Sequence, residues 1–202
     1  MILKINPEHP EKKKTDQAIE ILRQGGVIAY PTDTVYGIGA DIFNKQAIKK
    51  IYQIKKRDYK KPLSVICADI QEMAQYAIIQ DYAYKLMKKV LPGPYTFILK
   101  AKNKTPDNFI SKQKTVGVRI PDHPVSQALV TGLGNPITTT SLNLSGDEII
   151  ANPNQMSKEM ANKFDLIIDS GTLSKEASTI IDLSGPTPLI LREGKGETSL
   201  FD

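Results

Sequence analysis

The stretch TDQAIEILRQGGVIAY, residues 15–30, sets the pattern for the whole chain. Ala18, Ile19 and Leu22 recur at the spacing of one helix face, and a pair of glycines follows as a stop signal. The apolar run VIAY comes next and is typical of a short buried strand. A helix that leads directly into a buried strand predicts an α/β arrangement.

The same alternation continues toward the C-terminus. Asn44 is expected to cap the next helix, and PTDTVYGIGA, residues 31–40, is expected to be a loop. Helix patterns occupy residues 45–54, 70–77, 81–90 and 125–134, and strand patterns occupy residues 63–67, 91–101 after an initial turn, 115–120, 136–140, 165–169, 178–184 and 188–192. No repeat, low-complexity linker or shift in composition divides the chain. We therefore expect one α/β domain over residues 1–202, a twisted open mixed sheet with flanking helices, whose ligand site lies where loops leave the strand ends.

Composition excludes several classes of protein. The 202 residues are 40% hydrophobic and 24% charged, which is typical of a soluble globular protein. No apolar run approaches the roughly 18 residues that span a bilayer, and the N-terminus lacks the order of a secretory signal. Cys67 is the only cysteine, and His9 and His123 are the only histidines, so a Cys/His zinc site is excluded. We therefore expect a cytoplasmic protein that makes no contact with a membrane.

Positive charge is in excess and is locally concentrated. The net charge of +5 favours anionic partners such as nucleotides, phosphates or RNA, although a mild surplus of lysine is as often only a solvated surface. Five cations lie within the seven residues from Lys55 to Lys61, at the end of a predicted helix. Taken alone they favour a solvated helix end, where cations suit the helix dipole. Lysine beside arginine also suits a polyphosphate, because a point charge and a planar fork complement each other.

The stretch TTTSLNLSG, residues 138–146, leaves a predicted strand with many hydroxyl and amide side chains. One interpretation is a set of Asx or Ser turns, in which these side chains satisfy their own backbone. The other interpretation is a loop that faces a substrate. The rest of the chain must decide between the two.

Arg119 and Arg192 each end an apolar strand pattern, in VGVRI and PLILR. An arginine in such a place needs an anion, which is either a protein carboxylate or a ligand carboxylate. The dinucleotide and Walker fingerprints are absent, and no Ser-His-Asp set is evident. A site rich in donors and poor in bases suits nucleotidyl transfer, with Mg²⁺ neutralising the phosphates. The residues alone predict a protein that binds a nucleotide and a small carboxylate.

Six segments in order resemble the YrdC/YciO family of threonylcarbamoyl-AMP synthases. The segments are PTDTVYGIGA, Lys-x-Arg at 55–57, VGVRIPDHP, TTSLNLSG, STIIDL and LREG, and the resemblance runs from Gly26 to Gly194. It implies a YrdC-like fold with a basic concave face and a motif-bearing core of residues 15–194. It also implies a chain without the C-terminal accessory domain that longer members carry.

The resemblance further implies an activity. Members combine L-threonine, bicarbonate and ATP into threonylcarbamoyl-AMP and pyrophosphate. The product supplies the group that downstream threonylcarbamoyl-transferase proteins place on adenosine 37 of tRNA. Mg²⁺ would be brought in by the ATP phosphates, so no metal site on the protein and no organic cofactor are expected. The basic face would contact tRNA or dsRNA. The alternative is a YciO-type RNA- or nucleotide-binding relative without this synthesis, toward which LMKKVLPGPYTFILK and LREGKG lean.

Residue roles follow from the same resemblance. The catalytic set is Lys55, Arg57, Ser141 and Asn143; the ATP-binding set is Lys55, Arg57, Lys61, Thr115, Asn143 and Arg192; and the threonine-binding set is Thr32, Thr34, Arg119, Ser141 and Ser178. The sequence does not separate Thr32 from Thr34, so both are kept. Two positions depart from the family pattern. Leu142 replaces the small residue of a Ser-Ala-Asn loop, and Ile66 stands where some members carry histidine.

Overall fold

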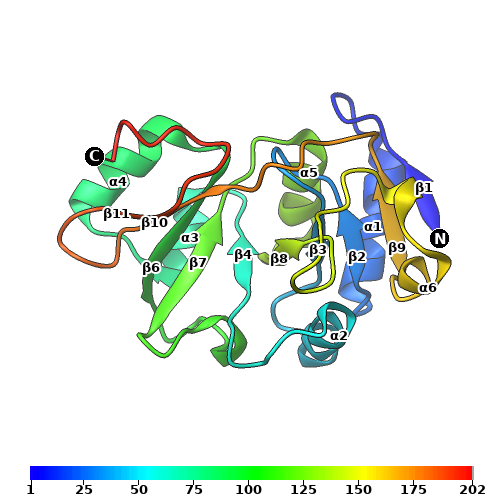
Figure 1. Cartoon of the computed structure of the whole chain (residues 1–202), viewed down its shortest axis with the longest axis horizontal. Helices are drawn as coiled ribbons and strands as arrows, with labels where there is room; N and C mark the ends of the chain where they lie inside the picture. The colour runs from blue at the N-terminus through cyan, green and yellow to red at the C-terminus, as the bar shows by residue number, and fades with distance from the viewer. Residues whose placement is uncertain (202) are drawn as a thin grey trace.

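An eleven-stranded mixed sheet carries helices on both faces in the computed structural model, which describes residues 1–201 (Figure 1). The helices are α1 Lys12–Arg23, α2 Lys45–Lys55, α3 Ile70–Tyr76, α4 Asp81–Val90, α5 Pro124–Leu133 and α6 Lys158–Ala161, with 3₁₀ turns η1 Asp107–Phe109 and η2 Pro153–Gln155. The strands are β1 Ile2–Lys4, β2 Ile28–Tyr30, β3 Gly37–Gly39, β4 Ser64–Ile66, β5 Ala77–Ile78, β6 Tyr95–Ala101, β7 Thr115–Arg119, β8 Ile137–Ser141, β9 Leu166–Asp169, β10 Thr179–Asp182 and β11 Leu189–Arg192.

The strand order mixes parallel and antiparallel neighbours. It runs β1-β9-β2-β3-β8-β4-β7-β6-β10-β11, and β5 pairs with β6 off this path. The β1–β9, β2–β9, β4–β7 and β6–β10 pairs are parallel, whereas the β3 and β8 neighbours at the centre are antiparallel. The two ends of the chain lie at opposite ends of the sheet (Figure 1). The predicted α/β class with a mixed sheet and flanking helices is confirmed.

Each face of the sheet has its own apolar cluster, because successive strand residues point to opposite faces. On one face Ile28 and Tyr30 pack in a cluster with buried residues of α1 and α5. On the other face Val27 and Ala29 pack in a larger cluster with buried residues of α2, α3 and α4. The alternation of side chains over residues 27–30 therefore determines which helices cover which face of the sheet.

The predicted helices form, and α2 begins as expected. The Asn44 side chain accepts a hydrogen bond from the backbone N–H of Ala47 at 2.9 Å. His123 caps α5 in the same way, because its Nδ1 accepts a hydrogen bond from the backbone N–H of Val125 at 3.2 Å. Both side chains satisfy a donor that the first turn of a helix leaves free.

The prediction that residues 31–40 are all loop is wrong for Gly37–Gly39, which form β3. A Cβ atom on Gly39 would lie 2.6 Å from an atom of the Tyr30 ring, so the glycine makes room for that ring. Glycine is uncommon inside strands, which is why the pattern indicates a loop. The short elements β1, β5 and α6 were not predicted either.

Candidate active site

A pocket of about 450 Å³ lies over the middle strands of the sheet. Its lining includes side chains from β4, β6, β7, β8 and β10, among them Ser64, Thr96, Arg119, Thr139, Ser141 and Ile180. Ser64 and Thr139 lie two residues from Ile66 and Ile137, which pack in the cluster with α1 and α5. The pocket therefore lies on the face that carries α1 and α5, over strands that these helices leave uncovered.

A second pocket of about 460 Å³ joins the first at the C-terminal end of α2. Lys55, Lys56 and Lys61 line this second pocket. The residues common to both linings are Arg57, Thr140, Ser141, Asn143 and Gly146. Together the two pockets make one continuous depression, here called the groove, with separate groups of cations at its two ends.

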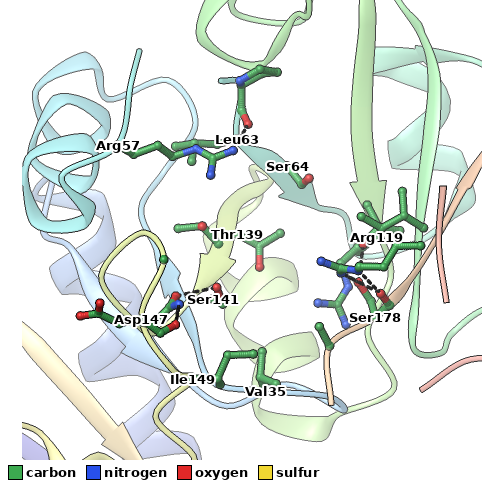
Figure 2. A pocket seen from close by; sticks show the side chains of 18 residues that line it. Val35, Arg57, Leu63, Ser64, Arg119, Thr139, Ser141, Asp147, Ile149 and Ser178 are labelled. Carbon is green, nitrogen blue, oxygen red and sulfur yellow. Dashed lines mark hydrogen bonds between the residues drawn. The ribbon is translucent and has the colours of Figure 1, made fainter. Parts of the chain in front are cut away.

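Figure 2 shows the cations of the first pocket on opposite sides. The Arg57 guanidinium lies on one side and the Arg119 guanidinium on the other, with Thr139 and Ser141 between them. Asp147 stands at the rim and is exposed. The polar side chains between the arginines are hydroxyl and amide groups, which can donate to an anion without opposing its charge.

Lys55 is buried, which overturns the expectation of a solvated helix end for this residue. Its Nζ atom donates to the carbonyl oxygen of Ser141 and to Oδ1 of Asn143, both at 2.6 Å. Burial, with the nearby Arg57 charge as the second cause, lowers the pKa of Lys55 from 10.5 to about 8. The side chain is held at the cost of desolvating a charge, in a place where a bound anion would offset that cost.

The polar loop after β8 completes its own turn, as the first interpretation of TTTSLNLSG expects, and it also lines the groove. Ser141 Oγ donates to Asn143 Oδ1 at 2.7 Å, and Asn143 Nδ2 donates to the carbonyl of Asp147 at 2.7 Å. The N–H of Ser145 donates to the carbonyl of Lys55 at 3.0 Å, which docks the loop on the end of α2. These bonds fix the two polar side chains at the junction of the two pockets.

Arg57 is half-buried and lines both pockets. Its guanidinium donates to the backbone carbonyls of Lys61 and Pro62, each at 3.2 Å. Lys56, immediately before it, has a positive φ of 48° and forms the left-handed cap that ends α2. The sharp turn lets Lys55 point inward while Arg57 faces the groove from the following loop.

Arg119 is buried at the end of β7 and already has a carboxylate partner. One of its terminal nitrogens donates to Asp33 Oδ1 at 2.9 Å and to Thr34 Oγ1 at 3.1 Å. Thr32 Oγ1 lies 3.1 Å from Thr34 Oγ1 and donates to the carbonyl of Val35 at 2.6 Å. The structure therefore brings Arg119 to PTDT, with Thr34 in direct contact and Thr32 one bond further away.

Arg192 and Ser178 meet at the same end of the groove. The Arg192 guanidinium donates to the Ser178 carbonyl at 2.7 and 3.1 Å and to Ser178 Oγ at 3.3 Å. Ser178 Oγ also lies 2.8 Å from Thr96 Oγ1. Burial, followed by the charge of Arg119, lowers the pKa of Arg192, so the two guanidinium groups stand close enough to repel. Two nearby cations favour an anion between them.

Thr115 is not brought to this site. It stands at the start of β7, at the end of the strand opposite Arg119, and bonds to Ser111 at 2.7 Å. Neither pocket of the groove includes it in its lining. Conversely, the sequence prediction missed Asp33 and Thr96, which bond to predicted site residues. Asp33 lies between the two predicted threonines, and its position in PTDT was the available signal.

The two departures from the family pattern leave the groove open. Leu142 is fully buried and packs in the larger apolar cluster rather than lining either pocket. Ile66 is also buried, in the cluster beneath α1 and α5. Among residues 1–201 no helix is long and apolar enough to cross a membrane.

Comparison with known proteins agrees with this arrangement. The uncharacterized protein YciO of Escherichia coli is 39% identical over 199 residues, which cover 98% of this chain and 97% of that protein. The crystal structure of E. coli YciO superposes with a TM-score of 0.94 at 38% identity and covers 100% of this chain and 98% of its own.

A relative with a named activity and a solved structure with bound L-threonine are also similar to this chain. The threonylcarbamoyl-AMP synthase of Bacillus subtilis is 36% identical over 184 residues, which cover 88% of this chain and 52% of that protein. P. abyssi Sua5 complexed with L-threonine has a TM-score of 0.89 at 31% identity, covering 96% of this chain and 57% of that chain. The family model for Sua5, YciO and YrdC, described as "Telomere recombination", matches residues 20–194. The chain therefore belongs to the Sua5/YciO/YrdC family.

Proposed function

We propose that this protein is an L-threonylcarbamoyladenylate synthase, which makes threonylcarbamoyl-AMP and pyrophosphate from L-threonine, bicarbonate and ATP. The observation that carries the proposal is the groove with cations at both ends and the Ser141–Asn143 loop between them. One end suits a polyphosphate, and the other suits a carboxylate. A reaction that joins a nucleotide to an amino acid derivative needs both.

At the α2 end, Lys55, Arg57 and Lys61 bind the triphosphate in this proposal. Lys55 supplies a buried point charge, and Arg57 supplies a planar fork whose remaining donors face the groove. Asn143, and Arg192 from the opposite end of the groove, contact the rest of the nucleotide. Thr115, which the resemblance includes in this set, is left out because it does not line the groove.

At the β7 end, Arg119 binds the carboxylate of threonine, while Ser141, Ser178 and the PTDT threonines orient it. Thr34 is favoured over Thr32 for this part, because it bonds directly to Arg119. The likeness to P. abyssi Sua5 complexed with L-threonine supports threonine as the amino acid. The threonine amine and bicarbonate give a carbamate with the loss of one water molecule. A carbamate oxygen then displaces pyrophosphate from the α-phosphorus of ATP.

Mg²⁺ is expected to arrive with the phosphates of ATP, whose charge it neutralises. Among residues 1–201 no group of three or more His, Cys, Asp or Glu side chains could hold a metal ion. Asp58 and Asp147 line the groove and are the carboxylates within its lining that could meet a phosphate-bound ion. This donor set fits an ion that keeps its waters and phosphate ligands. No organic cofactor is required.

The product is passed, in this proposal, to downstream threonylcarbamoyl-transferase proteins that modify adenosine 37 of tRNA. Lysine side chains around the end of α2 would also allow contact with tRNA or dsRNA. A contact of this kind should weaken steeply with salt and should compete with ATP where the surfaces overlap.

Pyrophosphate release tests the proposal. The protein is incubated with ATP, Mg²⁺ and bicarbonate and with each common amino acid in turn. Threonine should give the highest rate; serine, which lacks one methyl, should be poorer by about 1–3 kcal/mol, and valine, which lacks the hydroxyl, should fail more completely. Release with every amino acid, or with none, would overturn the assignment.

The second candidate is a YciO-type nucleotide- or RNA-binding protein that does not make the adenylate. Its support is the likeness to E. coli YciO over nearly the whole of both chains. This candidate predicts ATP binding without threonine-dependent release of pyrophosphate. The same assay, with ATP binding measured in parallel, separates the two.

A further inference from the structure

Two buried side-chain polar atoms have no hydrogen-bond partner among residues 1–201, and both belong to one ion pair. They are Nε of Arg119 and Oδ2 of Asp33. The same two side chains are joined at 2.9 Å through their other atoms, and they are only 7% and 9% exposed. Buried polar atoms without partners are rare and costly, so a site that places both in one pair requires an explanation.

The two members of the pair line different cavities. Arg119 lines the first pocket of the groove, whereas Asp33 lines a different pocket of about 420 Å³ beside Thr32 and His123. The backbone of Asp33 is anchored, because Lys195 Nζ donates to its carbonyl oxygen at 2.6 Å. An anion that reaches Arg119 from the groove must therefore compete with a carboxylate whose backbone is held in place.

The two unpartnered atoms require hydrogen-bonding partners of opposite kinds. Arg119 Nε needs an acceptor, and Asp33 Oδ2 needs a donor. A carboxylate alone would supply the acceptor but would leave Asp33 buried without a cation, which is unfavourable. An α-amino acid carries a carboxylate and an ammonium group on one carbon atom, so it supplies both.

We propose that Asp33 is a specificity-determining residue that holds Arg119 in the empty site and receives the ammonium group of an α-amino acid once its carboxylate has taken over Arg119. The proposal rests on the proposed function in so far as Arg119 binds the amino acid. The exchange explains why both atoms are closed to solvent before the ligand arrives. It makes Asp33 an internal competitor of simple carboxylates and a partner of amino acids.

The variant Asp33→Asn should affect the binding of simple carboxylates and of amino acids in different directions. Without the internal carboxylate, Arg119 is free, so (R)-3-hydroxybutanoate, which is threonine without its amino group, should bind at least as tightly as to the wild type. L-Threonine should bind roughly tenfold or more weakly, because its ammonium group loses a charged acceptor. A residue that merely supports the fold would weaken both ligands together.

The experiment is a calorimetric titration of both ligands into wild type, Asp33→Asn and the control Asp122→Asn. Asp122 is exposed and lines the same cavity, so its variant removes the same charge without touching Arg119. The proposal requires that the ratio of the two affinities change in Asp33→Asn and stay at the wild-type value in Asp122→Asn. Equal losses for the two ligands in Asp33→Asn, or an unchanged ratio, would overturn it.

Two further measurements keep the outcome decisive. If Asp33→Asn does not fold, as judged by its thermal melt, the wild type alone is compared with both ligands, and equal affinities would overturn the proposal. Pyrophosphate release by the wild type is measured separately. If the ratio changes in Asp33→Asn but the wild type releases no pyrophosphate, the proposed synthesis is contradicted and the exchange at Asp33 is supported. If the wild type is active but the ratio is unchanged, only the exchange is contradicted.

Discussion

Replacing Lys55 by methionine should separate binding from stability, because the buried ammonium group affects them in opposite directions. The side chain is 2% exposed, and its pKa is lowered from 10.5 to about 8. That difference corresponds to about 3 kcal/mol in favour of the neutral form. Methionine has a similar length and no charge, so it removes this cost together with the hydrogen bonds to Ser141 and Asn143.

The two stability effects partly cancel. Hydrogen bonds to a charged group contribute about 1.5–3 kcal/mol each, so the two lost bonds amount to about 3–6 kcal/mol, against about 3 kcal/mol of removed desolvation cost. The free energy of unfolding should therefore fall by no more than about 3 kcal/mol. ATP binding has no such offset, because in the proposed function the lost ammonium group binds the triphosphate. The dissociation constant for ATP should therefore rise roughly 10- to 100-fold.

Denaturant unfolding and calorimetry with Mg²⁺ and ATP measure the two quantities. Lys49→Met is the matched control, since Lys49 is exposed on the same helix. A loss of more than about 4 kcal/mol of stability in Lys55→Met, with ATP affinity equal to that of the control, would refute the reasoning and make Lys55 a structural residue.

The pKa of Lys55 also predicts how stability depends on pH. The unfolded chain keeps the Lys55 proton up to about pH 10.5, whereas the folded chain keeps it only to about pH 8. The contribution of this group to the free energy of unfolding of the wild type should therefore rise as the pH increases between those values.

Four other outcomes are expected. In a titration series, ATP affinity should fall by up to about tenfold per pH unit above pH 8, where the folded protein loses the Lys55 proton, and Lys55→Met should not show the fall. Arg57→Ala should weaken ATP binding roughly 10- to 100-fold, and Arg57→Lys should restore it only in part, as measured by calorimetry. Arg119→Ala should abolish threonine binding and lower unfolding free energy by about 3–5 kcal/mol, because a buried carboxylate loses its partner; ATP affinity should be nearly unchanged. Gly39→Ala should lower the melting temperature, with a cost of about 1–3 kcal/mol, because the added Cβ would meet a tyrosine ring at 2.6 Å.

Regular periodicity made most of the fold predictable. The helix face of Ala18, Ile19 and Leu22 is buried as expected, since apolar spacing alone determines which side of a helix meets the sheet. β3 has no such signal, because its two glycines contribute no side chains and are defined by what packs over them. A strand whose glycines make room for a neighbouring ring cannot be predicted from the pattern of apolar side chains.

The candidate site, like the fold, was predictable only in part. The sequence predicts that Arg119 needs an anion and leaves a protein carboxylate and a ligand carboxylate as alternatives. The structure supplies Asp33, 86 residues earlier in the chain. No local pattern links the two, because their contact depends on the sheet bringing the end of β7 to the loop after β2. Burial of Lys55 was likewise unpredictable, since it requires the loop after β8 to dock on α2.

The substitutions that distinguish this chain from the family pattern lie behind the groove rather than in it. Leu142 and Ile66 pack in the two apolar clusters, so neither side chain lines the groove of this chain. Donors in the lining of the groove include Lys55, Arg57, Ser141 and Asn143 toward the α2 end and Arg119 with Arg192 at the other. A loss of activity therefore cannot be inferred from a missing donor within this set. Any difference in chemistry from a threonylcarbamoyl-AMP synthase should instead appear in which carboxylate displaces Asp33 from Arg119, because that exchange is the one step at which the protein's own anion competes with the substrate.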